Sequence, residues 1–295
     1  MLTRRNVATM ALAGATGLLL PPVARNAGAQ EAPSRFALPS PRGRADQTMD
    51  VFYHRPAGVT ADAPVLFVLH GNGRNAQSYL GAFTRLADRA GVVLLAPHFS
   101  HALFPNSRDY NQGEMFDATG KPKPRETWSF AVVEQAFDAY KAQFGSSRSR
   151  YMIYGHSAGA QFVHRFLLFM PDARVDRAVA ANAGYYMMPD PSQAYPYGPK
   201  GTAATDADYS AWFGRPLTVL LGDQDIDPQH AELVRTPEAN LQGPYRLARG
   251  ETFFAAAQRE AARINARFNW TKQIVPGVAH ENSRMAPPAA ALLFG

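Results

Sequence analysis

The sequence contains no cysteine and carries little net charge. Without cysteine the chain forms no disulfide and cannot be attached to a lipid through a thiol, so its stability must come from its core. The net charge is +6, and it falls to +3 when Arg4, Arg5 and Arg25 in the acid-free first 29 residues are left out. So small a surplus does not indicate a nucleic-acid partner, since such proteins carry a clustered basic face.

Recognisable metal motifs are also missing. The eight histidines form neither H-E-x-x-H nor H-x-H, so the sequence indicates no transition metal, and we expect no cofactor. The segment Asp223–Asp227 imitates the start of a calcium loop. However, Pro228 stands where that loop requires glycine, and Val234 where it requires its final glutamate. We therefore expect no calcium site of that type.

The N-terminal segment has the order of an export signal. Arg4-Arg5 precedes an apolar run from Ala8 to Leu20, which is too short and too diluted with Gly and Thr for a permanent membrane anchor. The small-x-small sequence Ala27-Gly28-Ala29 follows. This pattern predicts a twin-arginine signal, residues 1–29, cleaved after Ala29. We expect residues 30–295 to form one domain, without internal repeats, in the periplasm or outside the cell.

Apolar runs of strand length alternate with helical patterns along the chain. Several runs are apolar throughout and bounded by turn residues, as strands buried on both faces of a parallel sheet are. Strands are expected at 49–54, 64–69, 92–97, 151–154, 178–183, 217–221 and 270–275, and helices at about 75–90, 128–144, 158–170 and 251–268. The alternation predicts an α/β fold with a doubly wound, mostly parallel sheet. Residues 30–43 are expected to form a leader or an edge segment, and 228–249 lack periodicity.

Residues 151–162 join an apolar strand to a helix through Gly155-His156-Ser157-Ala158-Gly159. A G-x-S-x-G turn needs small residues beside the serine so that the helix can pack back across the sheet. The serine then projects from the sheet edge, and the helix N-terminus faces any oxyanion formed there. The pattern favours acyl transfer with Ser157 as nucleophile. The alternative is an ordinary glycine-rich turn with an exposed serine.

An acid and a histidine follow two later strands. Asp225 lies just after Gly222, and His280 lies five residues after Val275. Because a serine hydroxyl is a weak nucleophile, we expect His280 to act as general base and acid and a carboxylate to orient it. Asp225 is preferred to Asp227 and Asp223, because this acid usually comes a few residues past the strand end, after a glycine.

The loop His70-Gly71-Asn72-Gly73 leaves an earlier buried strand. We expect the backbone amide of Asn72, together with that of Ala158, to form the oxyanion hole. The alternative is that His70-Gly71 only turns the chain into the following helix. His70 itself is expected to stabilise the loop.

Two long segments rich in aromatic residues interrupt the alternation. One is 99–126, and the other, 185–213, is an insertion after the sixth strand. A long segment of this kind can form a pocket wall or cap a site. For 185–213 we favour packing of the aromatic residues within the insertion.

These motifs resemble those of the α/β-hydrolase superfamily, which uses the chain order Ser, Asp, His. The matching residues are in Leu69–Gly73, Gly155–Gly159, Gly222–Asp225 and Pro276–His280. Within the superfamily, the pattern is similar to exported polyhydroxybutyrate depolymerase-like and feruloyl esterase-like serine esterases of bacteria. The resemblance implies hydrolysis of small or polymeric carboxylic esters. A peptidase or acyltransferase with the same triad, and a non-catalytic ligand-binding protein, remain alternatives.

Overall fold

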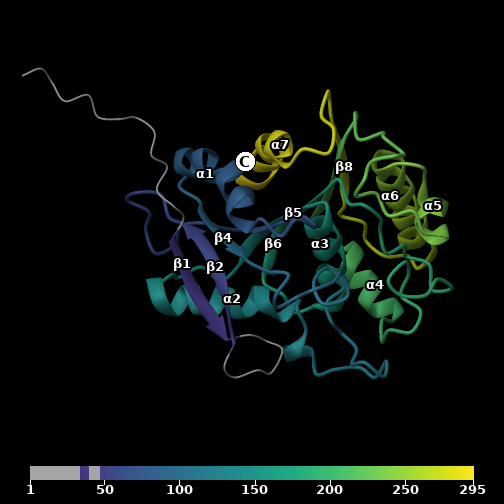
Figure 1. Ribbon diagram of the computed structural model, residues 1–295, viewed down its shortest axis with the longest axis horizontal. Coiled ribbons are helices and arrows are strands. Elements are labelled where there is room, and N and C mark those ends of the chain that lie inside the picture. Colours follow the sequence, from purple (N-terminus) through teal and green to yellow (C-terminus); the bar gives the residue numbers. More distant parts are fainter. Residues whose placement is uncertain (1–33, 40–46) are drawn as a thin grey trace, which may run out of the picture. The chain divides into compact units, whose positions relative to one another are not determined.

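The computed structural model describes residues 34–39 and 47–295, so the expected signal at 1–29 lies outside the described residues. The described chain forms one eight-stranded sheet in the order β1-β2-β4-β3-β5-β6-β7-β8 (Figure 1). Its strands are β1 (Ser34–Pro39), β2 (Thr48–His54), β3 (Val65–Leu69), β4 (Val93–Pro97), β5 (Tyr151–His156), β6 (Val175–Ala181), β7 (Leu217–Gly222) and β8 (Thr271–Val275). Pairing is parallel from β4 to β8, and β1 and β2 are antiparallel. The predicted doubly wound, mostly parallel sheet is confirmed.

Helices cover both faces of this sheet. One face packs against α1 (Ala76–Ala90) and α7 (Asn282–Phe294), which lie side by side in Figure 1. The other face packs against α2 (Ala131–Phe144), α3 (Ala158–Phe169), α4 (Asp206–Phe213) and α6 (Arg246–Arg263). The short α5 (Pro237–Gln242) precedes α6, and a 3-10 turn, Arg125–Thr127, precedes α2. Among the described residues, no helix has both the length and the apolar character needed to cross a membrane.

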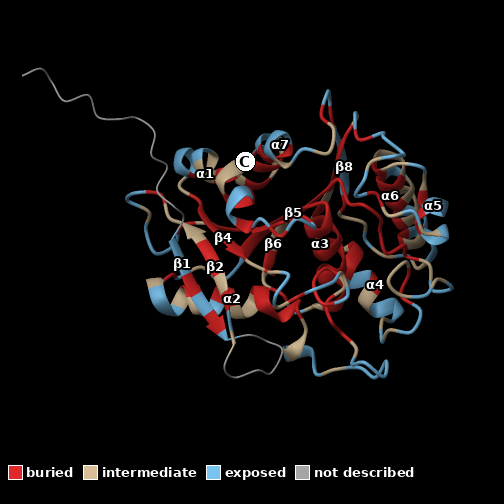
Figure 2. Cartoon of the chain, viewed as in Figure 1, coloured by how far each residue is buried: buried red, intermediate tan, exposed pale blue. Residues whose placement is uncertain are grey.

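The central strands β3 and β4 are apolar throughout because helices cover both faces of the sheet. In β3, Leu66 and Val68 face the α1 and α7 side, whereas Val65 and Phe67 face the other. Because successive side chains of a strand point to opposite faces, a strand covered on both sides is apolar at every position. Figure 2 shows the central strands buried along their length.

The helices of the structure differ from the sequence predictions in three places. The helix predicted over 251–268 is α6, which begins at Arg246 and ends at Arg263. The segment 228–249, expected to be irregular, contains α5, and the residues after His280, for which no element was predicted, form α7. Gly250 lies inside α6, where a Cβ atom would overlap the side chain of Leu221. The glycine therefore permits close packing of helix on strand and does not end the helix.

Candidate active site

Ser157 lies at a sharp turn between β5 and α3. Its φ is 58° and its ψ is −117°, a strained conformation for a residue other than glycine. Cβ atoms built on Gly155 and Gly159 would overlap backbone atoms, of Gly159 in the first case and of Leu69 in the second. The two glycines are thus required for the helix to approach the sheet, as the sequence predicted.

The structure brings together three side chains that are far apart in sequence. The Oγ of Ser157 donates a hydrogen bond to Nε2 of His280 over 3.0 Å, and Nδ1 of His280 donates to Oδ2 of Asp225 over 2.7 Å. The side chain of His280 is 9% exposed and that of Asp225 is 3% exposed. Burial lowers the pKa of His280 below its usual value, although the hydrogen bond to Asp225 acts in the opposite direction. The imidazole is therefore unprotonated at neutral pH and can accept a proton from Ser157.

Only one of the three aspartates after β7 contacts the imidazole. Asp225 is buried, whereas Asp227 is exposed and accepts from the amide of Gln229. Asp223 accepts from the amide of Gly277 and so fixes the loop that leads to the histidine. The sequence preference for Asp225 over its two neighbours agrees with this geometry.

A buried asparagine connects the ends of the strands around the site. Asn182, which follows β6, accepts from the amide of Gly222 and donates to the carbonyl of Ala279, the residue before His280. Its φ of 48° lies in the left-handed region, which asparagine tolerates better than most residues. Asn182 thus ties the acid-bearing loop to the histidine-bearing loop. The apolar run 178–183 predicts only a strand at Asn182, so this role was not predicted.

The loop after β3 lies directly beside the serine. A Cβ atom built on Gly71 would be 3.5 Å from Cβ of Ser157. Asn72 lines the same pocket as the serine, and Ala158 is the first residue of α3, where amides have no intrahelical acceptor. The expected pair of oxyanion donors, Asn72 and Ala158, is thus placed next to the nucleophile.

Two buried side chains hold this loop. His70 donates from Nδ1 to the carbonyl of Gly71 and accepts at Nε2 from the amide of Phe99. Burial lowers the pKa of His70 to about 3, so it remains neutral. Arg74 donates to the carbonyls of Phe99 and Asn106 and stacks on Tyr110, with 4.5 Å between its guanidinium carbon and the ring centroid. His70 therefore stabilises the loop, as expected from the sequence. The role of Arg74 was not predicted.

Ser157 opens into a pocket of about 380 Å³. Its walls come from the loop after β3, the first turns of α1, the elbow, Glu232, His280 and the start of α7. Glu232 and Glu281 are exposed, and no lysine or arginine is among the described residues that line the pocket, but Arg284 pairs with Glu281 over 3.7 Å. The lining therefore contributes a negative potential, which Arg284 partly offsets at Glu281.

Neither aromatic-rich segment lines this pocket. In 99–126, the rings of Phe104 and Tyr110 are fully buried in the core, and the hydroxyl of Tyr110 donates to the carbonyl of His70. In 185–213, Tyr186 and Trp212 are also buried. Trp212 packs against Tyr209 and Phe213 inside the insertion, as the favoured interpretation holds. However, Tyr186 also packs against Phe253, and Trp212 against Trp270, outside it.

Other polar residues near the motifs have structural partners. His164 donates to the carbonyl of Ala160 and accepts from the amide of Met187, as expected of a structural histidine. His156 hydrogen-bonds to the Tyr79 hydroxyl through Nδ1, and its ring lies 4.6 Å from that of His280. Within residues 34–39 and 47–295, no group of three or more acidic or histidine side chains could hold a metal ion.

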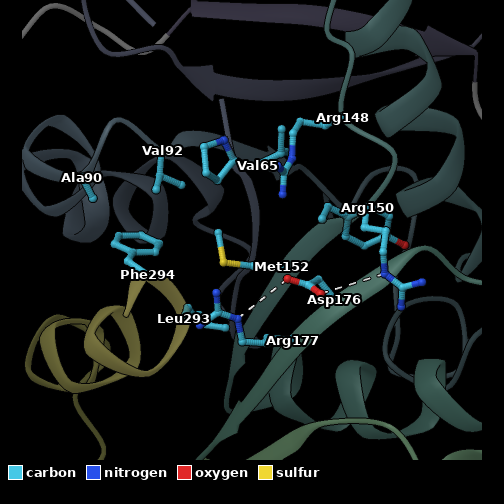
Figure 3. A pocket seen from close by; sticks show the side chains of 12 residues that line it. Val65, Ala90, Val92, Arg148, Arg150, Met152, Asp176, Arg177, Leu293 and Phe294 are labelled. Carbon is cyan, nitrogen blue, oxygen red and sulfur yellow. Dashed lines mark ion pairs between the residues drawn. The ribbon is translucent and has the colours of Figure 1, made fainter. Parts of the chain in front are cut away.

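A second pocket, of about 90 Å³, lies at the amino ends of central strands (Figure 3). Val65 and Met152 come from the amino ends of β3 and β5, and Asp176 and Arg177 from that of β6. Asp176 forms long ion pairs of 4.0 Å with Arg150 and 3.8 Å with Arg177. Because ligands of open α/β sheets bind at the carboxyl ends of the strands, this pocket is not the expected place for chemistry.

The strand order, the sharp turn at Ser157 and the hydrogen-bonded Ser-His-Asp set are those of α/β hydrolases, and the chain belongs to this superfamily. Poly(aspartic acid) hydrolase-1 from Sphingomonas sp. KT-1 is 45% identical, with a TM-score of 0.85 over 90% of this chain and 99% of that one. LpqC, the poly(3-hydroxybutyrate) depolymerase from Bordetella parapertussis, is 35% identical, with a TM-score of 0.83 over 88% and 89%. The protein is thus a hydrolase, and its resemblance to polyhydroxybutyrate depolymerase-like proteins is confirmed.

More distant structures share only the fold. An S-formylglutathione hydrolase from Agrobacterium tumefaciens is 16% identical, with a TM-score of 0.56 over 88% of this chain and 95% of that one. No protein-family model and no curated protein matches the chain.

Proposed function

We propose that the protein is an exported serine hydrolase that cleaves carboxylic esters through a Ser-His-Asp triad and an acyl-enzyme intermediate. The observation that carries the proposal is the continuous hydrogen-bond chain from Ser157 Oγ through His280 to Asp225, with distances of 3.0 and 2.7 Å. A serine activated in this way attacks a carbonyl carbon, and the bond to the leaving group is then broken.

Each member has a defined step. His280 accepts the proton of Ser157 as Oγ attacks, and then gives it to the departing alcohol. Asp225 keeps the imidazole in the tautomer whose Nε2 is free and stabilises the imidazolium that forms. The amides of Asn72 and Ala158 hold the negative oxygen of the tetrahedral intermediate. A water molecule then attacks the acyl carbon while His280 accepts its proton; the bond to Oγ of Ser157 breaks, His280 returns the proton to Oγ, and the acid is released.

The charge of the pocket favours a neutral substrate. Glu232 and Glu281 line it, and Arg284 offsets part of the charge of Glu281. The remaining negative potential opposes a polyanion and leaves a neutral ester unaffected. The relative LpqC is described as a poly(3-hydroxybutyrate) depolymerase, and poly(3-hydroxybutyrate) is a neutral polyester that fits this requirement. We therefore propose a neutral ester, small or polymeric, as the substrate.

A second candidate is cleavage of the amide bonds of poly(aspartic acid), supported by the 45% identity to poly(aspartic acid) hydrolase-1. The same triad serves both reactions, because an amide and an ester pass through similar tetrahedral intermediates. The two candidates differ in the charge of the polymer.

A fluorophosphonate probe and a substrate panel test the proposal. We expect the wild type to be labelled at one site, Ser157→Ala to lose both labelling and turnover, and the melting temperature to be nearly unchanged. An unlabelled wild type, beside a fully labelled reference esterase, would instead support a ligand-binding protein. In the panel, the rates of cleavage of poly(3-hydroxybutyrate) and of poly(aspartic acid) are measured for the wild type and for the double variant Glu232→Gln, Glu281→Gln. Faster cleavage of poly(aspartic acid) than of any ester by the wild type would establish the second candidate.

Export is the other part of the proposal. It is supported by the paired arginines, Arg4 and Arg5, and by the small residues around Ala29. Cell fractionation and N-terminal sequencing test it, and an unprocessed N-terminus on protein purified from its native cells would contradict it.

A further inference from the structure

The carboxylate of Asp225 has a second partner besides His280. Its Oδ1 accepts from Nη1 of Arg246 over 3.2 Å, while Oδ2 is occupied by the imidazole. Arg246 is 1% exposed and lies in the first turn of α6, and the amide of Leu247 in the same turn donates to the carbonyl of Asp225. The start of α6 therefore contacts both the side chain and the backbone of Asp225.

The other arm of the guanidinium is also fixed. Nη2 of Arg246 lies 3.2 Å from Nδ1 of His230, and the amide of Glu232 donates to the same nitrogen. A guanidinium can only donate hydrogen bonds, so Nδ1 of His230 must carry the lone pair. The His230 ring lies edge-on to that of His280, with 5.5 Å between centroids. The planar fork of Arg246 is thus held between two acceptors, which restricts its orientation.

We propose that Arg246 is a positioning residue of the active site, which holds the Asp225 carboxylate in the orientation that accepts from His280. The proposal rests on the proposed function, because it assigns a role within that triad. A buried carboxylate with one oxygen unpaired would turn toward water or toward other donors. With one oxygen bonded to Arg246, only the other is available to the imidazole.

The charge of Arg246 has a second effect. It offsets the negative charge of Asp225, and the cation contributes to lowering the pKa of His280. Removing the cation alone would let His280 hold its proton to higher pH, whereas turning Asp225 away from the imidazole would remove the hydrogen bond and the attraction that raise the pKa of His280. The direction in which the titration moves therefore separates a charge effect from a positioning role.

Three variants separate the two roles. Arg246→Met removes the charge and the fork but keeps much of the volume, whereas Arg246→Lys keeps the charge and loses the fork. The matched control is Arg249→Met, one turn further along α6. Arg249 is also fully buried, but it donates to the carbonyls of Gly184, Val234 and Gly243 and to Asn240, and not to the triad.

For Arg246→Met we expect kcat on an activated ester to fall by about 10² with little change in KM, as for a small misplacement of a catalytic group. The acid limb of kcat/KM and the NMR titration of the labelled His280 imidazole should both move to lower pH, because Asp225 raises the pKa of His280 by more than Arg246 lowers it. In Arg246→Lys, the acid limb of kcat/KM should stay near its wild-type position, and kcat should still fall severalfold. Arg249→Met should lower the melting temperature and leave the limb in place.

An unchanged or upward-shifted titration of His280 in a folded Arg246→Met protein would overturn the proposal. If that variant does not fold, wild-type kcat in Arg246→Lys would overturn it equally. The NMR titration needs no substrate, so it is independent of the proposed function. A protein that neither hydrolyses esters nor reacts with a fluorophosphonate, but whose His280 titration moves to lower pH in Arg246→Met, would refute the function and keep the positioning role.

Discussion

Acid should destabilise this protein through histidines that are buried in the neutral form. His70 is fully buried, and its pKa in the folded protein is about 3, compared with about 6.5 in an unfolded chain. Above pH 6.5 the residue is neutral in both states. As the pH falls below 6.5, the unfolded chain binds a proton that the folded protein cannot, so stability is lost down to about pH 3. At pH 5 the loss is 1.5 pH units multiplied by 1.36 kcal/mol, or about 2 kcal/mol for His70 alone.

Burial also lowers the pKa of His156 and His164 well below the usual value, so each adds a loss of the same sign. A domain has a total stability of about 5–15 kcal/mol, so the combined effect is large. The assay is urea unfolding at pH 7 and pH 5, for the wild type and for His70→Gln, which cannot titrate. We expect the variant to lose about 2 kcal/mol less than the wild type between the two pH values. The exposed His101→Gln serves as control, and equal losses in the wild type and His70→Gln would refute the reasoning.

Three further predictions concern the site. Asp225→Asn should lower kcat by about 10⁴, because an amide does not hold the required tautomer of His280, whereas the exposed Asp227→Asn should retain wild-type kcat; steady-state kinetics on an activated ester compare them. Gly159→Ala should lower the melting temperature strongly, because its Cβ would overlap the carbonyl of Leu69, and an unchanged melting curve would contradict the close approach. Since burial lowers the pKa of His280, kcat/KM should remain constant at neutral pH and fall only below about 6.5, and a fall that begins above pH 7 would count against this base.

The sequence predicted the central sheet and the arrangement of the motifs because both depend on local patterns. Strands buried on two faces are recognisable from continuous apolar runs, and the elbow from glycines that steric contact requires around Ser157. The order of Ser157, Asp225 and His280 then places each residue after a strand of one parallel sheet. Because the sheet fixes where these strands end, the sequence could predict that the three residues lie close together.

The parts that were missed depend on tertiary contacts. α7 contains Pro287 and Pro288, which disfavour a helix interior, but burial of Met285 and Leu293 against the sheet and α1 outweighs this preference. At the start of α6, Gly250 resembles a helix breaker, so the turn that carries Arg246 was not predicted. No short motif identifies a buried arginine as the partner of an acid some twenty residues away.

The two hydrogen bonds of Asn182 have a consequence for how this enzyme can diversify. They link the ends of two neighbouring loops through one rigid amide, so the spacing between acid and imidazole does not depend on how long the surrounding surface segments are. Insertions and deletions in the outer walls of the pocket could therefore change which molecules enter while the reacting groups keep their separation. New specificities would then arise at the rim, with the chemical centre inherited unchanged.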